Sequence, residues 1–262
     1  MEANPARGPT NLLRSVTVPM AVLVSLVVAL AWYVTWSTSD WTMTLAKPTI
    51  TAAGATALGA FLAILVVMMV AMMLPSALPM ILAYRGLTRL ESGKPVKPAD
   101  NLGTLLFILP YFLVWGAFSI LALLGLVALG LTGGTMTLAR GYALAAAGIV
   151  LAAGAYQFTR PKDTCLTECA SPMQFVMRHW RSGHPGALRM GARHAMYCIG
   201  CCWLFMLVLF VAGAMSLLWM GIISLVIFAE KVGSNRVSVS RIIGGLLLVF
   251  GAALLAQNFL VV

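Results

Sequence analysis

The chain has 262 residues, of which 61% are hydrophobic and only 9% are charged. A soluble domain carries charge on about a quarter of its residues, so this composition excludes a soluble globular protein. The net charge of +10 does not indicate nucleic-acid binding, because the Lys and Arg residues lie in short segments between apolar stretches and form no continuous basic face. We therefore expect an integral membrane protein in contact with the lipid bilayer.

The apolar stretches predict an all-α polytopic fold with about seven transmembrane helices in one domain, residues 1–262. Each stretch is close to the roughly 20 residues that cross a bilayer. One of the two longest, Met196–Ala229, would extend about 50 Å as one helix, so we expect two short helices that separate near Gly213–Ser216. The first stretch is longer than a signal-peptide core and lacks a small-residue cleavage site, so we expect it to be retained. The predicted spans are Ser15–Trp36, Thr51–Tyr84, Leu102–Leu131, Leu138–Thr159, the two halves of Met196–Ala229, and Arg241–Val262.

Positive charge predicts the orientation of these spans. With seven spans, fifteen of the seventeen Lys and Arg residues fall on one side, and only Lys47 and Arg140 fall on the other. Short loops rich in Lys and Arg stay in the cytoplasm. We therefore expect a cytoplasmic N-terminus, an external C-terminus and a cytoplasmic Cys/His-containing loop at 160–194. Trp32 and Trp36, near the end of the first stretch, are expected at the membrane interface.

The second stretch contains a methionine-rich segment with two prolines, Pro75 and Pro79. Each proline lacks a backbone donor, so we expect a bend between them and freed carbonyl groups that need partners inside the protein. Thioethers could line a path for a soft metal ion, or the methionines could simply be flexible packing. The methionines that we expect to face other helices are Met69, Met73 and Met80.

The loop at 160–194 begins with a C-x3-C pair, Cys165 and Cys169. On a helix, four-residue spacing places both thiols on one side, and Met173 and Met177 continue the interval. Pro172 is expected to interrupt this helix. A pair of this kind indicates metal ligands or redox thiols, with two small buried thiols as the alternative.

The most specific motif is Gly191–Trp203, which contains His194, Cys198, Cys201 and Cys202. At about 100° per residue these four side chains fall within an arc of roughly 100° on one helix face. Three cysteines within five residues of a cysteine-poor chain are unusual as packing. The pattern favours metal ligation by thiolate and imidazole. Dithiol redox chemistry is the second interpretation.

Other ionisable residues give weaker indications. His179 lies near the cysteines in sequence and is a further ligand candidate, whereas His184 is expected in a solvated turn. Glu230 and Lys231 directly follow an apolar run, and we interpret them as an interfacial ion pair, with an ion path as the alternative. The sequence contains no recognisable catalytic or nucleotide-binding motif, so we name no catalytic residue.

Three motifs together resemble domain of unknown function family 2182. They are A-M-M-L-P-S-A-L-P-M at 71–80, C-L-T-E-C-A-S-P at 165–172 and G-A-R-H-A-M-Y-C-I-G-C-C-W at 191–203. Members of that family are described as predicted metal-binding integral membrane proteins of bacteria. The resemblance implies a multi-pass protein of the bacterial inner membrane. It also implies a set of metal ligands, namely Cys165, Cys169, His194, Cys198, Cys201 and Cys202.

The leading functional hypothesis is a soft-metal-binding protein that handles or transports Cu(I) across the membrane. Thiolates and thioethers select Cu(I), whereas Zn²⁺ suits Cys and His but leaves the methionines without a role. We expect metal binding, and the sequence does not decide whether any turnover occurs. The alternatives are a membrane thiol-disulfide oxidoreductase linked to quinone and a structural assembly subunit. The motifs predict neither protein partners nor an oligomeric state.

Overall fold

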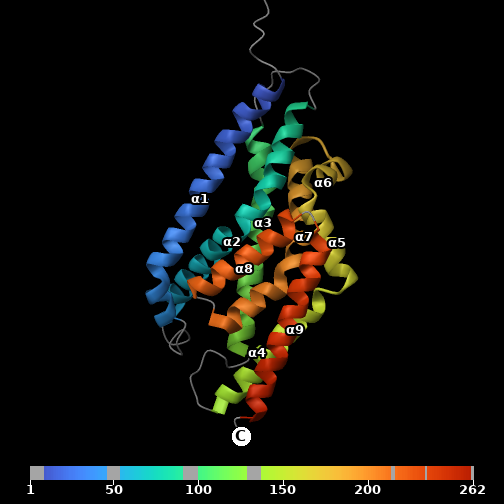
Figure 1. Cartoon of the computed structure of the whole chain (residues 1–262). Helices are drawn as coiled ribbons and strands as arrows, with labels where there is room; N and C mark the ends of the chain where they lie inside the picture. Colours follow the sequence, from blue (N-terminus) through green and yellow to red (C-terminus); the bar gives the residue numbers. More distant parts are fainter. Residues whose placement is uncertain are drawn as a thin grey trace, which may run out of the picture.

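The structure is a computed structural model that describes residues 9–45, 54–90, 100–128, 137–213, 216–233 and 235–260. These residues form helices and no strand, which confirms the all-α prediction (Figure 1). The helices of the described residues are α1 (Pro9–Leu45), α2 (Gly54–Leu90), α3 (Asn101–Ala128), α4 (Thr137–Tyr156), α5 (Arg160–Ala170), α6 (Pro172–His179), α7 (Gly183–Gly213), α8 (Leu217–Val232) and α9 (Arg236–Leu260).

Five helices in the described part of the chain are long and apolar enough to cross a membrane, so the membrane class is supported. The spans are Val18–Ser39, Leu62–Thr88, Asn101–Ala122, Gly183–Phe210 and Arg236–Phe259. The apolar part of α4 is shorter, and α8 has only 16 residues, so the count of seven stays a prediction. The start of α1 and the end of α9 lie at opposite ends of the bundle, as an odd number of spans requires (Figure 1). Lys47, Lys94 and Lys97, which contribute to the charge argument, lie outside the described residues.

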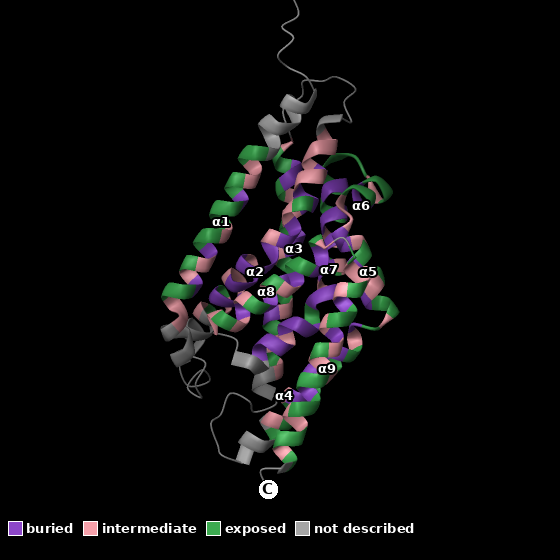
Figure 2. Cartoon of the chain, viewed as in Figure 1, coloured by how far each residue is buried: buried purple, intermediate pink, exposed green. Residues whose placement is uncertain are grey.

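Helices α2 and α7 form the interior of the bundle, and α1 and α9 lie at its edge (Figure 2). About two thirds of the α2 span is buried, at 67%, whereas the α1 and α9 spans are each 17% buried. A helix that is apolar on every side can lie at the centre of a bundle. The outer helices expose apolar side chains such as Leu26 and Leu246, as expected for surfaces that contact lipid.

The proline segment of α2 satisfies its freed carbonyl through a neighbouring helix. Pro75 has no N–H to donate to the carbonyl of Ala71, four residues earlier. Trp32 Nε1 of α1 donates to this oxygen at 3.1 Å. Tyr111 OH of α3 donates to the nearby Met73 carbonyl at 3.3 Å. The prediction of partners inside the protein is therefore confirmed for the carbonyl that Pro75 frees, while α2 continues as one helix and a bend stays a prediction.

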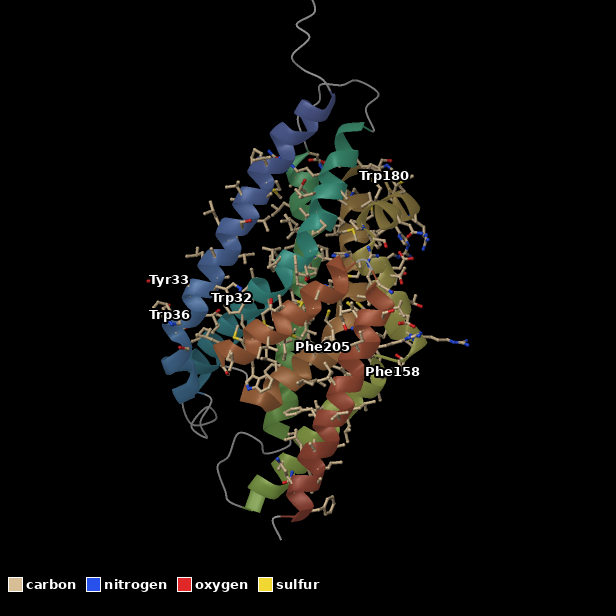
Figure 3. All side chains as sticks on the ribbon, in the orientation of Figure 1. Trp32, Tyr33, Trp36, Phe158, Trp180 and Phe205 are labelled. Atoms are coloured by element: carbon tan, nitrogen blue, oxygen red, sulfur yellow. The ribbon has the colours of Figure 1, made fainter. Side chains whose placement is uncertain are left out.

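Trp32 is not the interfacial anchor that we expected from the sequence. Its indole turns toward α2, whereas Tyr33 and Trp36 project from the outer side of α1 (Figure 3). The requirement of the Ala71 carbonyl for a donor explains why an indole is directed into the bundle.

The segment 160–194 is largely helical. It contains α5, α6 and the first turns of α7, and α5 ends where Pro172 begins α6, as predicted. Helix α7 begins at Gly183 and not at Met196, because Ala187, Met190 and Ala195 bury a continuous face against the bundle. The predicted separation near Gly213–Ser216 is confirmed, since α7 ends at Gly213 and α8 begins at Leu217. The cytoplasmic location of this segment stays a prediction.

Candidate metal-binding site

Helix α7 carries a buried group of three thiols. Cys198, Cys201 and Cys202 are each at most 2% exposed. Cys201 Sγ lies 3.2 Å from Cys202 Sγ and donates to the carbonyl of Cys198 at 3.1 Å. The one-face pattern predicted for these cysteines therefore corresponds to a face that points into the protein.

Helix α5 brings a fourth thiol to the group. Cys169 is buried and hydrogen-bonds to both Cys198 and Cys201. The hydrogen bond to Cys198 raises the pKa of the Cys169 thiol. The two cysteine motifs therefore converge through Cys169. We call Cys169, Cys198, Cys201 and Cys202 the thiol cluster.

Cys165 occupies a different position. It is half-buried against Gly200, where a Cβ atom would lie 2.6 Å from its sulfur. Gly200 thus allows α5 to approach α7 closely. Burial raises the pKa of Cys165, and in the described part of the chain it forms no hydrogen bond with another thiol. Of the C-x3-C pair, only Cys169 belongs to the thiol cluster.

A buried lysine, which the sequence did not reveal as part of the site, contacts the cluster. Lys231 Nζ donates to Cys198 Sγ at 3.3 Å and to Ser76 Oγ at 3.0 Å. Tyr111 OH lies 3.4 Å from the same sulfur. A buried ammonium requires a counter-charge. Among the described residues no carboxylate accepts a hydrogen bond from Lys231, so its ammonium is directed at the sulfur of Cys198.

Glu230 and Lys231 are not an interfacial ion pair. They are 1% and 4% exposed, and their side chains have separate partners. Glu230 accepts from Lys162 Nζ of α5 at 2.7 Å, and Lys162 also donates to the Cys201 carbonyl at 2.7 Å. The apolar helix α8 extends through both residues and thus carries their charges inward. The Lys162–Glu230 pair joins α5, α7 and α8 directly beside the thiol cluster.

His194 lies one helical turn before Cys198 and is 2% exposed. Phe107, Tyr111 and Phe175 surround its ring, with centroid distances of 6.1, 5.8 and 5.8 Å. Gly191 permits this enclosure, because a Cβ atom there would collide with the Phe107 carbonyl. Neither ring nitrogen of His194 has a hydrogen-bond partner among the described residues. A buried polar atom without a partner is costly, so these nitrogens are available to a ligand.

The remaining ligand candidates differ in how far they are buried. Met69, Met73 and Met80 are buried among helices, as predicted. Met173 and Met177 are exposed, so they do not contribute to the buried site. His179 is half-buried beside the Phe175 carbonyl, and His184 is exposed near Asp100, consistent with a solvated position.

The thiol cluster is held by hydrogen bonds and does not have the geometry of a finished coordination site. Within the described residues, no three His, Cys, Asp or Glu side chains are arranged to hold a metal ion. A soft ion would have to replace the thiol protons.

The fold and the buried cysteines define a helical protein of the membrane-spanning class with a soft-donor centre. The model of a family described as copper chaperone, PpoB2, matches residues 62–254, and the chain belongs to this family. This match supports the predicted link to copper and a metal-related family, although domain of unknown function family 2182 is not confirmed by name. No curated protein and no solved structure matches the chain.

Proposed function

We propose that this protein binds Cu(I) at the thiol cluster and transfers it within or across the bacterial inner membrane. The observation that carries the proposal is the convergence of Cys169 from α5 on Cys198, Cys201 and Cys202 from α7. Thiolates select Cu(I) over harder ions. The membership of the copper chaperone family supports copper over zinc.

Lys231 gives the cluster a suitable charge. A Cu(I) ion held by two thiolates carries one net negative charge, which would be costly to bury alone. The ammonium of Lys231, 3.3 Å from Cys198 Sγ, can neutralise this charge. His194, whose ring nitrogens have no partner in the described structure, can supply a further ligand from the preceding turn.

The methionines of α2 continue from the cluster into the bundle. Tyr111 links the two groups, because its hydroxyl contacts both Cys198 Sγ and the Met73 carbonyl. Met73 and Met69, one turn apart on α2, are both buried. Weak thioether ligands would allow an ion to leave the thiolates and move along α2.

The test is anaerobic Cu(I) binding by the reduced, purified protein, measured in competition with a chromophoric chelator. The C198S/C201S/C202S variant should bind at least about 100-fold more weakly, because it lacks most of the soft donors. Helicity and elution volume of the variant confirm its folding. Equal binding by both proteins would refute the site assignment.

Transfer requires a separate experiment. In proteoliposomes, the M69L/M73L variant should bind Cu(I) as the unmodified protein does but pass less of it across the membrane, since Leu keeps the volume and removes the thioether. An unchanged transfer rate would exclude the α2 path without affecting the binding site.

A thiol-disulfide oxidoreductase is the second candidate, and the approach of Cys169 on α5 to Cys198 and Cys201 on α7 favours it. Two thiols would form one disulfide and pass two electrons and two protons to a quinone, which becomes quinol. Reversible quinone-dependent disulfide formation in protein without bound copper would support this function over the first.

A further inference from the structure

A cationic pocket lies at the end of the bundle marked by Trp180 in Figure 3. It has a volume of about 280 Å³ and lies where α6 approaches the first turns of α7. Its lining residues are His179, Arg181, Arg189, Met190, Ala192 and Arg193. The lining contains no acidic residue, and none of the three arginines forms an ion pair within the described residues.

Three unneutralised guanidinium groups around one pocket attract anions and repel a free cation. The site therefore does not suit bare Cu⁺ or hydrated divalent ions. It suits a small molecule that bears carboxylate or similar groups and has an overall negative charge. The volume is close to the lower end of the range for small-molecule sites, about 300 Å³.

The floor of the pocket contains a soft metal donor, which a site for a simple anion would not need. Met190 lines the pocket yet is 2% exposed. His194, Cys198 and Cys202 follow at intervals of four residues along α7, and all are buried. Residues spaced in this way lie along one helix face, so the series rises over about 18 Å from the pocket to the thiol cluster.

The histidine in this series is free to accept a ligand. The ring of His194 is enclosed by aromatic side chains, and both nitrogens lack partners in the described structure. Phe175 contacts His194 on one side and His179, which lines the pocket, on the other. Buried donor side chains therefore continue along α7 from the pocket to Cys198.

We propose that the arginine pocket is the entry site for Cu(I), which arrives as a small anionic thiolate complex and passes through Met190 and His194 to the thiol cluster. The arginines bind the carboxylates of the carrier. The soft donors of α7 then replace the carrier thiolates one at a time. Each cysteine that forms a Cu–S bond gives its proton to the displaced carrier thiolate, which leaves as the thiol, and the oxidation state of copper does not change. This inference rests on the proposed function and adds the chemical form of the cargo.

The test compares two Cu(I) donors of opposite charge, the glutathione complex and the cationic acetonitrile complex. Loading of the reduced full-length protein is followed by stopped-flow absorbance of the copper-thiolate bands. In the R181Q/R189Q/R193Q variant, loading from the glutathione complex should slow by about tenfold or more. Loading from the acetonitrile complex should stay equal or become faster, and the final amount of bound copper should not change.

Arg160→Gln is the control for the loss of one positive charge, because Arg160 is exposed on α5 and outside the pocket. It should leave both rates unchanged. Met190→Leu keeps the volume of the side chain and should slow loading from both donors. Folding of every variant is checked by its final copper content.

The outcomes separate the inference from the proposed function. If the triple arginine variant slowed copper loading equally from both donors, or from neither, the entry site would be refuted. The proposal of copper binding at the thiol cluster would stand. Loss of co-purified anionic phospholipid in that variant, with unchanged copper loading, would assign the pocket to a lipid headgroup and overturn the inference. If the unmodified protein took up no copper from either donor, both proposals would be refuted.

Discussion

Lys231 Nζ lies 3.3 Å from Cys198 Sγ in the interior of the bundle, and among the described residues no carboxylate accepts a hydrogen bond from this lysine. Lys231→Met should weaken Cu(I) binding by about tenfold or more, since the anionic copper-thiolate complex would lose its buried counter-charge. Lys231→Arg keeps the charge and should retain most of the affinity. Chelator competition measures both. Tighter binding by Lys231→Met would instead show that the ammonium competes with the metal.

The sequence predicted the helical class, the break between α7 and α8 and the burial of Met69 and Met73, because each follows from local periodicity or composition. It did not predict the direction of Lys231. A lysine at the end of an apolar helix can extend outward to the interface or inward to a partner, and only the partner decides. The partner, Cys198, is more than thirty residues away, so no local pattern records the contact.

The four-residue spacing of Cys165 and Cys169 also did not predict that the two thiols lie in different environments. Four residues on an ideal helix place two side chains on the same side, but the neighbours differ along that side. Gly200 admits Cys165 to a shallow position, whereas Cys169 reaches the interior. The start of α7 was missed because Arg189 and Arg193 indicate a loop, although Met190, His194 and Cys198 already show the four-residue interval of a buried face.

Serine substitution should distinguish the two members of this pair. Cys169→Ser should reduce Cu(I) affinity by about tenfold or more, whereas Cys165→Ser should have little effect, because only Cys169 contacts the other thiols. Competition titrations of both variants give the comparison. Equal losses would mean that Cys165 moves into the site when copper binds.

The pH dependence of binding provides a related test. The pKa of Cys169 is raised, so its thiol is protonated near neutral pH and copper must displace the proton. Affinity should therefore fall as the pH is lowered, and the slope should be shallower in Cys169→Ser. An identical slope in both proteins would exclude proton release from Cys169.

The buried Lys162–Glu230 pair should be important for stability. Glu230→Gln leaves Lys162 buried without its counter-charge and should lower the free energy of unfolding by about 3–5 kcal/mol. The exposed Arg178–Glu168 pair is the matched control, and Arg178→Gln should change stability by at most about 1 kcal/mol. Denaturant unfolding in detergent measures both. Similar values for the two variants would show that the interior pair is solvated.

Orientation can be tested by cysteine labelling in a Cys165→Ser background, since the remaining thiols are buried. Met177 on α6 and Phe259 near the end of α9 are both exposed. A membrane-impermeant maleimide should label Phe259→Cys in intact cells and Met177→Cys only after lysis, because the Lys and Arg distribution predicts a cytoplasmic α6. The reverse pattern would refute the predicted topology and place the arginine pocket outside.

The hydrogen bond from Trp32 to the Ala71 carbonyl predicts a coupling between α1 and Pro75. Trp32→Phe removes the indole donor and leaves this carbonyl without a partner in the bundle, which should cost about 1–3 kcal/mol of stability. In a Pro75→Ala background the new N–H of residue 75 can bond to the same oxygen, so Trp32→Phe should cost less there. A double-mutant cycle of unfolding free energies isolates this difference from the packing loss common to both backgrounds. Identical costs in the two backgrounds would show that the indole acts through packing alone.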